Sequence, residues 1–349
     1  MTDSQSNRSV QSLFRPFSSG TLSLSNRIVM APMTRQFSPE GVPGENVAAY
    51  YRRRAENDVG LIVTEGTIID HPDASNQPNV PHIYGEAALE GWKNVVSQVH
   101  AAGGKIIPQI WHMGARGQVG EYTEEEVAEI VRQFAHSAAA AKEAGFDGIE
   151  LHGAHEYLID QFFWAKTNPR TDRYGGDMVQ RTRFAVEVIE ACRASVGSDF
   201  PIVFRFSQWK GSDYTAKLAE TPEELERFLK PLSEAGVDVF HCSTRRFWQP
   251  EFEGSDLNLA GWTKKLTGKP TITVGSVGLD GEFLTLFKEG KGAGVSGIED
   301  LLKRLEDGEF DLVAIGRALL ADPAWANKVR QGRQDELVAF SPAAVQELY

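Results

Sequence analysis

Two histidines and one tyrosine within residues 148–158 are the side chains best suited to do chemistry. His152 and His155 stand three residues apart, and Tyr157 follows two residues later. Side chains alternate along a strand, so the imidazoles can converge only if the chain turns at Gly153 into a helical turn. Two N–H groups could then bind one oxygen atom, while Tyr157 offers a proton from another direction. Taken alone, the two histidines fit a metal half-site or a buried, hydrogen-bonded pair better than a catalytic site. Other parts of the sequence must therefore distinguish these alternatives.

Length and composition exclude several classes of protein. The chain has 349 residues, 41% hydrophobic and 24% charged, which is enough to bury a large core as one α/β barrel domain. No run approaches the ~20 apolar residues of a membrane span, and residues 1–10 lack the apolar run of a secretory signal, so we expect a cytoplasmic protein. A net charge of −12 argues against a nucleic-acid partner. Cys192 and Cys242 are too few for a disulfide framework or a cysteine-ligated cluster.

Apolar β-rich runs alternate with amphipathic stretches of helical length, which predicts a parallel sheet with crossover helices. The strand candidates are 27–31, 60–64, 105–110, 148–151, 201–206, 237–242, 270–274 and 311–315. Helical stretches between them include 87–102, 123–144, 178–196 and 221–235. Eight such units without a linker predict a single-domain (β/α)8 TIM barrel at residues 13–335. A flexible N-terminal segment (1–12) and a C-terminal tail (336–349) would flank it.

Local signals mark the ends of several helices. Ala-Gly pairs precede three of the strands, which fits glycine ending a helix in a left-handed conformation. Thr123 with Glu126, and Thr221 with Glu224, predict capping boxes at two helix starts.

Several predicted strands end in residues that packing does not require. The fifth strand carries Arg205, a cation among apolar residues that needs an anionic or electron-rich partner or a buried ion pair. Residues 275–278 (Gly-Ser-Val-Gly) and Gly316-Arg317 follow the seventh and eighth strands, where barrels often bind phosphate. With Gln109 on the third strand, these groups suit a phosphorylated planar cofactor with polar ring edges, which they do not by themselves name.

Five ordered motifs resemble the old yellow enzyme family of FMN-dependent ene-reductases. The likeness runs from about Leu13 to Gly332. The motifs are Asn26-Arg-Ile-Val-Met-Ala-Pro-Met-Thr34, Gln109-Ile-Trp-His112, His152-Gly-Ala-His-Glu-Tyr-Leu158, Asn168-Pro-Arg-Thr-Asp-Arg-Tyr-Gly-Gly176 and Gly316-Arg-Ala-Leu319.

The resemblance implies an FMN site at the mouth of the barrel. Thr34 would donate to the flavin ring, Gln109 would pair with its polar edge, and Arg205 would face the position where reduction places negative charge. The complete set implied to contact FMN is Ala31, Pro32, Met33, Thr34, Gly66, Gln109, Arg205, Gly275, Ser276, Gly316 and Arg317.

The resemblance also implies a reaction. NADPH or NADH would reduce FMN, and an α,β-unsaturated carbonyl or nitro compound would then take the hydride in the same site, by ping-pong kinetics. His152 and His155 would donate to the substrate oxygen, Tyr157 would protonate the α carbon, and Trp111 would contact the substrate. We expect no metal ion and no membrane partner, and a homo-oligomer is one option for the assembly.

The chain departs from the common pattern of this family at three places. Glu156 stands where many members have glycine, residues 162–167 replace a more usual Leu-Ser-Pro stretch, and an alanine precedes Arg116. These departures concern the range of substrates rather than the cofactor.

Three other functions are to be weighed. A flavin amine dehydrogenase would need an iron–sulfur cluster and further domains. A flavin-free phosphate-binding lyase or isomerase would need a lysine at an inner strand end, whereas Lys105 opens a strand and Lys210 lies beyond one. The third alternative is a non-catalytic flavin binder, against which the intact His152, His155 and Tyr157 set argues.

Overall fold

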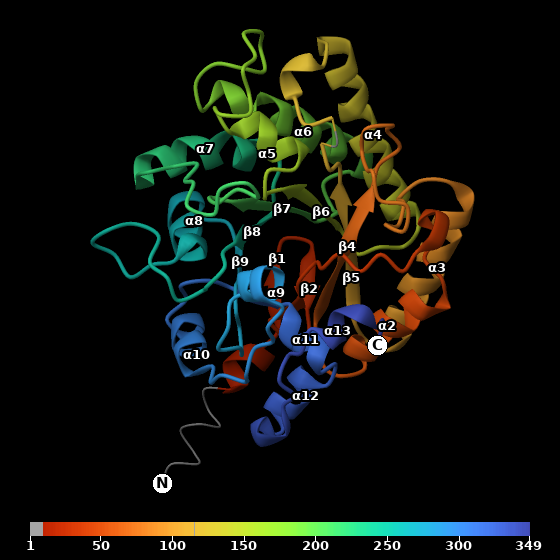
Figure 1. Cartoon of the computed structure of the whole chain (residues 1–349), viewed down its shortest axis with the longest axis vertical. Coiled ribbons are helices and arrows are strands. Elements are labelled where there is room, and N and C mark those ends of the chain that lie inside the picture. Colours follow the sequence, from red (N-terminus) through yellow and green to blue (C-terminus); the bar gives the residue numbers. More distant parts are fainter. Residues whose placement is uncertain (1–9, 115) are drawn as a thin grey trace.

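Eight parallel strands close into a barrel surrounded by helices in the computed structural model, which describes residues 10–114 and 116–349 (Figure 1). The strands follow one another around the barrel in chain order, with the last strand pairing with the first. They are β3 (Ile28–Met30), β4 (Leu61–Ile68), β5 (Lys105–Trp111), β6 (Ile149–Gly153), β7 (Ile202–Ser207), β8 (Val239–Ser243), β9 (Thr271–Val274) and β10 (Leu312–Ile315). The predicted TIM barrel and its eight strands are confirmed.

The crossover helices lie on the outside of the barrel, as the amphipathic stretches predict. The longer ones are α2 (Glu45–Ala55), α3 (Glu86–Ala101), α4 (Glu124–Glu143), α6 (Arg183–Val196), α7 (Pro222–Ala235), α8 (Leu259–Thr267) and α10 (Glu299–Glu306). Shorter ones are α5 (Leu158–Phe163), α9 (Leu284–Glu289), α11 (Arg317–Ala321), α12 (Trp325–Arg330) and α13 (Ala343–Gln346). In the described part of the chain, none of the helices is long and apolar enough to cross a membrane.

One of the two predicted capping boxes is complete. Thr123 accepts from the Glu126 amide, and the Glu126 carboxylate accepts from the Thr123 amide in return. Thr221 also caps its helix by accepting from the Glu224 amide. The second box is nevertheless wrong, because the Glu224 carboxylate accepts from the amide of Glu220, one residue ahead of the cap.

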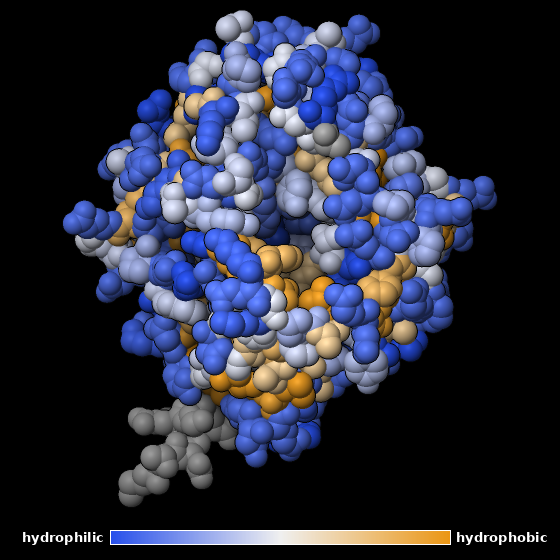
Figure 2. Space-filling model, in the orientation of Figure 1, coloured by the Kyte–Doolittle hydropathy of each residue, from blue (hydrophilic) through white to orange (hydrophobic). Residues whose placement is uncertain are grey.

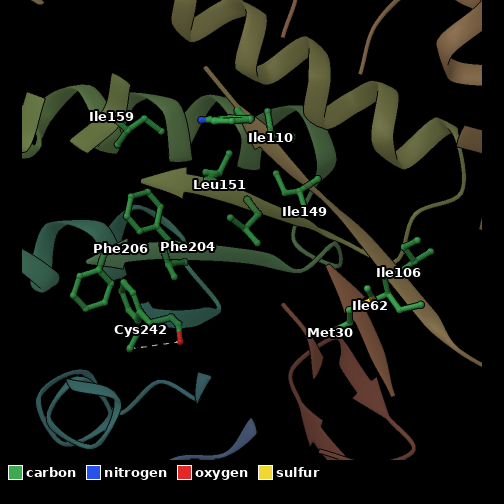
Figure 3. Close-up of a cluster of buried hydrophobic side chains, with 14 of the residues drawn as sticks. Met30, Ile62, Ile106, Ile110, Ile149, Leu151, Ile159, Phe204, Phe206 and Cys242 are labelled. Atoms are coloured by element: carbon green, nitrogen blue, oxygen red, sulfur yellow. Dashed lines mark hydrogen bonds between the residues drawn. The ribbon is translucent and has the colours of Figure 1, made fainter. Parts of the chain in front are cut away.

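Two separate apolar layers stabilise the barrel. The outer layer packs the outward faces of the strands against the helices, and Figure 3 shows part of it, including Ile149 and Leu151 of β6 and Phe204 and Phe206 of β7. The inner layer fills the lower barrel with smaller side chains such as Val203, and these side chains come from most of the strands. Both layers are the usual arrangement of a filled barrel.

A short antiparallel hairpin, β1 (Phe17–Ser19) and β2 (Leu22–Leu24), was not predicted. Its apolar side chains join the inner layer next to Leu61 and Leu312, which open their strands. The hairpin therefore closes the amino-terminal end of the barrel and leaves the opposite end for function.

The inward-facing side chains change from apolar to polar toward the carboxyl ends of the strands. Val203, Arg205 and Ser207 alternate along β7, and each is in register with Val239, His241 or Ser243 of β8. Inward and outward positions alternate along a strand, so both triplets face the barrel axis. The upper barrel is thus lined by ionisable and hydroxyl groups.

Parts of both flanking segments pack against the barrel. Val10 and Ser12 are buried in or beside the 3₁₀ turn η1 (Gln11–Phe14), so the packed body begins before Leu13. Residues 1–9 of the predicted flexible segment lie outside the described residues. The predicted tail folds back onto the barrel, where Arg35 donates to the carbonyl of Glu347 at 2.6 Å.

Candidate active site

The turn that carries the histidine pair is left-handed rather than helical. β6 runs to Gly153, and His155 and Glu156 then adopt φ values of 62° and 68° before α5 begins at Leu158. The predicted helical turn is therefore wrong, although the two rings do converge. The ring centroids of His152 and His155 lie 5.3 Å apart at 89°.

Tyr157 and Trp111 complete a cluster of four rings. Tyr157 lies edge-on to His152 and to Trp111, with centroid distances of 4.8 Å in both pairs. Trp111 itself stacks on His152 at 5.7 Å. A Cβ at Gly66 would lie 2.2 Å from the indole of Trp111, so glycine at this position admits the ring. The four side chains named from the sequence as the catalytic and substrate-binding set are thus brought together.

His155 is fixed by two neighbouring strands. Its Nε2 lies 2.7 Å from Oγ of Ser243, and its backbone amide donates to Oγ of Ser207 at 3.0 Å. The imidazole also stacks at 4.2 Å on Trp209, which follows β7. None of these three partners was assigned to the site from the sequence, because they lie far from His155 along the chain.

Burial and a nearby charge determine the protonation states of the histidines and Tyr157. Burial, with the Arg205 charge nearby, holds the pKa values of His152 and His155 well below the usual 6.5, so both rings are neutral at physiological pH. Burial raises the pKa of Tyr157 above 10.0, so its phenol keeps its proton. The cluster thus offers neutral N–H donors beside a protonated acid.

A buried polar chain that sequence reasoning missed lies beneath the histidines. Gln109 Nε2 donates to Glu150 at 3.0 Å, and the other Glu150 oxygen lies 2.8 Å from His241 Nδ1. Glu150 and His241 are fully buried. The alternation of side chains along a strand could have identified Glu150, because it shares the inward face of β6 with His152.

Arg205 lies next to this buried polar network and has no hydrogen-bond partner among the described residues. Its side chain is buried, and Nε is an enclosed donor with nothing to bind among the described residues. Burial lowers the pKa of Arg205 from its usual value, which the charge of Glu150 opposes. The buried ion pair weighed as an alternative is absent within the described chain, where no carboxylate lies within 4.0 Å of Arg205.

A cavity of about 490 Å³ opens beside the ring cluster, and Figure 2 shows a hollow bordered by apolar residues in this part of the surface. The predicted site residues that line it are Ala31, Pro32, Met33, Thr34, His155, Arg205, Gly275, Ser276, Gly316 and Arg317. Gly66, Gln109, Trp111, His152 and Tyr157 lie outside this lining, and His155 connects the cavity to the rings. A wider depression of about 740 Å³ beside α8 and α10 holds none of the predicted residues.

The far end of the cavity is suited to an anion. A Cβ at Gly275 would lie 2.6 Å from the Thr244 carbonyl oxygen, and φ there is 132°, so only glycine fits this close approach. Arg317 reaches the same loop by donating to the Gly281 carbonyl at 2.6 Å. Its Nη1 is enclosed and has no partner in the described chain, and burial lowers the pKa of Arg317 to about 10.

The enclosed arginine donors that lack a partner among the described residues and belong to the cavity lining include those of Arg35, of Arg205 near the histidines and of Arg317 at the far end. A buried unpaired cationic donor is costly, which indicates a ligand with acceptor groups at both ends. FMN has this form, with a phosphate at one end and a polar ring edge at the other. The residues present thus fit the cofactor that the motifs imply.

Comparison with known proteins places the chain in a family. The model of the NADH:flavin oxidoreductase / NADH oxidase family matches residues 12–124 and 116–336. An NADH oxidase of Thermoanaerobacter brockii is 36% identical over 91% of this chain and 50% of its own length. 12-Oxophytodienoate reductase 2 of Arabidopsis thaliana is 31% identical over 93% of this chain and 89% of its own length. A structure of morphinone reductase in complex with tetrahydroNAD superposes with a TM-score of 0.78 at 28% identity, covering 95% of this chain and 93% of that one.

The chain spans about half the length of the NADH oxidase and of a similarly related metal reductase of Desulforamulus reducens. FMN is the cofactor of the matched family, which confirms the cofactor expected from the sequence. The chain belongs to the NADH:flavin oxidoreductase / NADH oxidase family, and the resemblance to the old yellow enzymes is thereby confirmed.

Proposed function

We propose that the chain is an FMN-dependent NAD(P)H oxidoreductase that reduces the C=C bond of alkenes conjugated to a carbonyl or nitro group. The observation that carries this proposal is the ring cluster: two neutral imidazoles and a protonated phenol converge at the carboxyl end of the barrel. Such a set suits a substrate whose oxygen gains negative charge while a neighbouring carbon is protonated.

His152 and His155 would hold the substrate oxygen. Hydrogen bonds to an oxygen that becomes enolate-like are stronger in the transition state than in the ground state, which lowers the barrier. Tyr157 would donate its proton to the α carbon, because its raised pKa keeps the phenol protonated. Trp111 would help to orient both, since its ring contacts His152 and Tyr157.

The cofactor would be held by the residues named from the sequence, most of which line the cavity. Bound FMN supplies the hydride, which it receives from NADH or NADPH. Arg205 would stabilise negative charge on the reduced ring, and Gln109 and Thr34 would bind its polar edges. Gly275, Ser276, Gly316 and Arg317 would bind the phosphate, with Ala31, Pro32 and Met33 along the ring. Gly66 would support this set through Trp111.

The lysine-based alternative finds no support in the site. Lys210 is fully buried and lies 2.5 Å from Asp160, so its amine is held in an ion pair away from the cavity lining. An amine dehydrogenase would need a cluster that two buried cysteines cannot ligate. The cytoplasmic location, the oligomeric state and the lack of a nucleic-acid partner stay predictions from the sequence.

Cofactor content and turnover test the proposal together. The purified protein should hold one noncovalent FMN per chain and should oxidise NADH or NADPH in the presence of 2-cyclohexenone, maleimides or nitroalkenes. A colourless protein that takes up no FMN would contradict the cofactor assignment. A yellow protein that reduces none of these compounds with either nucleotide would contradict the activity.

A phenol titration tests the oxygen site separately. p-Hydroxybenzaldehyde should bind as its phenolate and give a long-wavelength charge-transfer band with oxidised flavin. His152→Ala/His155→Ala should abolish that band while FMN stays bound. His136→Ala, which removes an exposed imidazole on α4, is the matched control and should leave the band unchanged. Retention of the band in the double variant would show that the histidine pair is structural.

A further inference from the structure

The contacts of His155 leave one of its two ring nitrogens facing the cavity. Nε2 is taken by Ser243 Oγ at 2.7 Å, and the ring face is covered by Trp209. Among the described residues Nδ1 has no hydrogen-bond partner, and it is not among the enclosed side-chain atoms that lack one. Because His155 lines the cavity, Nδ1 is the nitrogen available to a ligand.

We propose that Ser243 is a positioning residue that sets the tautomer of His155, by donating its hydroxyl proton to Nε2 and so keeping the ring proton on Nδ1. A neutral imidazole carries its single proton on either nitrogen, whereas a hydroxyl can donate or accept. Only the Nδ1–H form can donate to a substrate oxygen, because the other form presents a lone pair to it. This inference rests on the proposed function, in which His155 binds that oxygen.

The direction of the Ser243 hydrogen bond follows from burial. Ser243 is 2% exposed, and within the described chain its hydroxyl has His155 Nε2 as its one partner. If the hydroxyl accepted from Nε2–H, its own proton would have no acceptor among the described residues, which carries the penalty of an unmade buried hydrogen bond. Donation to Nε2 satisfies the hydroxyl and the ring together.

In His152, a backbone amide and not a side chain determines which ring nitrogen carries the proton. The backbone amide of Ala154 points at its Nδ1 at 3.3 Å, and an amide can only donate. The proton of the neutral His152 ring is therefore on Nε2. The two rings thus present different nitrogens to one oxygen, and only the tautomer of His155 depends on a side chain.

Nitrogen NMR of the FMN-saturated protein tests this directly. Ring-labelled ¹⁵N-histidine distinguishes a protonated from a bare nitrogen, and the His155 signals are assigned by their loss in His155→Gln. Wild type should show protonated Nδ1 and bare Nε2 at His155. Ser243→Ala should shift the population toward Nε2–H, whereas Ser243→Thr, which keeps the hydroxyl, should behave as wild type.

Ser207 provides the matched control. It is the register partner of Ser243 on β7, but its hydroxyl contacts the His155 main chain and not the ring. Ser207→Ala should keep the Nδ1–H form. Affinity for p-hydroxybenzaldehyde, read from the charge-transfer band, should fall roughly 10- to 100-fold in Ser243→Ala, the size of one hydrogen bond to an ionised oxygen.

The outcomes separate this inference from the proposed function. Wild-type His155 with its proton on Nε2, or an unchanged tautomer in Ser243→Ala, would overturn the role of Ser243. If His155→Gln itself leaves phenolate affinity unchanged, the oxygen site proposed above fails instead. Should Ser243→Ala lose FMN or fold poorly, the wild-type and Ser243→Thr spectra still decide the tautomer.

Discussion

The Lys210–Asp160 ion pair should be among the most stability-critical contacts in the molecule. Both side chains are fully buried, with Nζ and Oδ1 2.5 Å apart, and the second Asp160 oxygen accepts from the amide of Glu156 at 2.7 Å. The pair thus connects the loop that carries Trp209 to the left-handed turn formed by His155 and Glu156. Lys210→Met keeps most of the side-chain volume and removes the charge.

The expected cost follows from leaving one buried charge alone. At 2.5 Å and an effective dielectric of about 20, the attraction is about 7 kcal/mol before desolvation. Relief of the lysine's desolvation reduces this, and breaking one side of a buried pair commonly costs about 3–5 kcal/mol. We therefore expect Lys210→Met to lower the free energy of unfolding by about 3–5 kcal/mol.

The assay is urea unfolding followed by circular dichroism at a fixed excess of FMN, with an exposed pair as the control. Lys303 of α10 and Asp307, the residue just after this helix, lie 2.7 Å apart and are 73% and 59% exposed, so Lys303→Met should cost no more than about 0.5 kcal/mol. Lys210→Met/Asp160→Asn, which removes both charges, should recover most of the loss. Equal costs for Lys210→Met and Lys303→Met would refute the reasoning.

The pH dependence adds a second check on the same variant. Burial already raises the pKa of Asp160, and Lys210 opposes that rise. Without Lys210 the folded-state pKa of Asp160 rises further, so the folded protein keeps a proton that the unfolded chain has lost. The stability of Lys210→Met should therefore fall, relative to wild type, as pH rises above the ordinary pKa of aspartate.

Two further predictions concern Tyr157 and the buried carboxyl group of Glu65. Tyr157→Phe should leave flavin reduction by nicotinamide within a few-fold and slow cyclohexenone reduction by ~10²-fold or more, because only the second step needs the proton; stopped-flow measurement of both half-reactions checks this, and equal losses would give Tyr157 a packing role. Burial raises the pKa of Glu65 from 4.5 to about 7, and its carboxylate accepts from the amides of Arg35 and Gln36. The folded state thus holds a proton that the unfolded state loses between pH 4.5 and 7, so wild-type stability falls as pH rises through this window. Glu65→Gln cannot titrate and should gain up to roughly 3 kcal/mol on wild type between pH 5 and 8 in urea unfolding; a pH-independent difference would contradict the shift.

The sequence predicts the barrel well because its strands are mostly apolar and its helices are amphipathic. The hairpin of β1 and β2 was not predicted, because strands of three residues are too short to show a clear alternation of apolar and polar residues. The handedness of the turn after Gly153 escaped for another reason: His155 and Glu156 adopt positive φ, which glycine would have signalled. Here the fold imposes the conformation on ordinary residues, through the Asp160 side chain that accepts from Glu156.

In the site, residues that are close in sequence could be predicted, whereas contacts made only by the fold could not. His152, His155 and Tyr157 are close in sequence and could be named from one motif. Ser243 contacts His155 across 88 positions, so only closure of the barrel brings the two together. Glu150 lies two residues before that motif, but its contact with Gln109 depends on strand register, which composition does not reveal.

The fate of a labelled hydride tests the proposed reaction most directly. NADH or NADPH carrying deuterium at the transferable C4 position is supplied with 2-cyclohexenone, and the product is analysed by NMR. Deuterium should appear at the β carbon of cyclohexanone, and in D₂O with unlabelled nucleotide it should appear at the α carbon. Deuterium on the carbonyl carbon of an allylic alcohol, or none in the product, would contradict the proposed function.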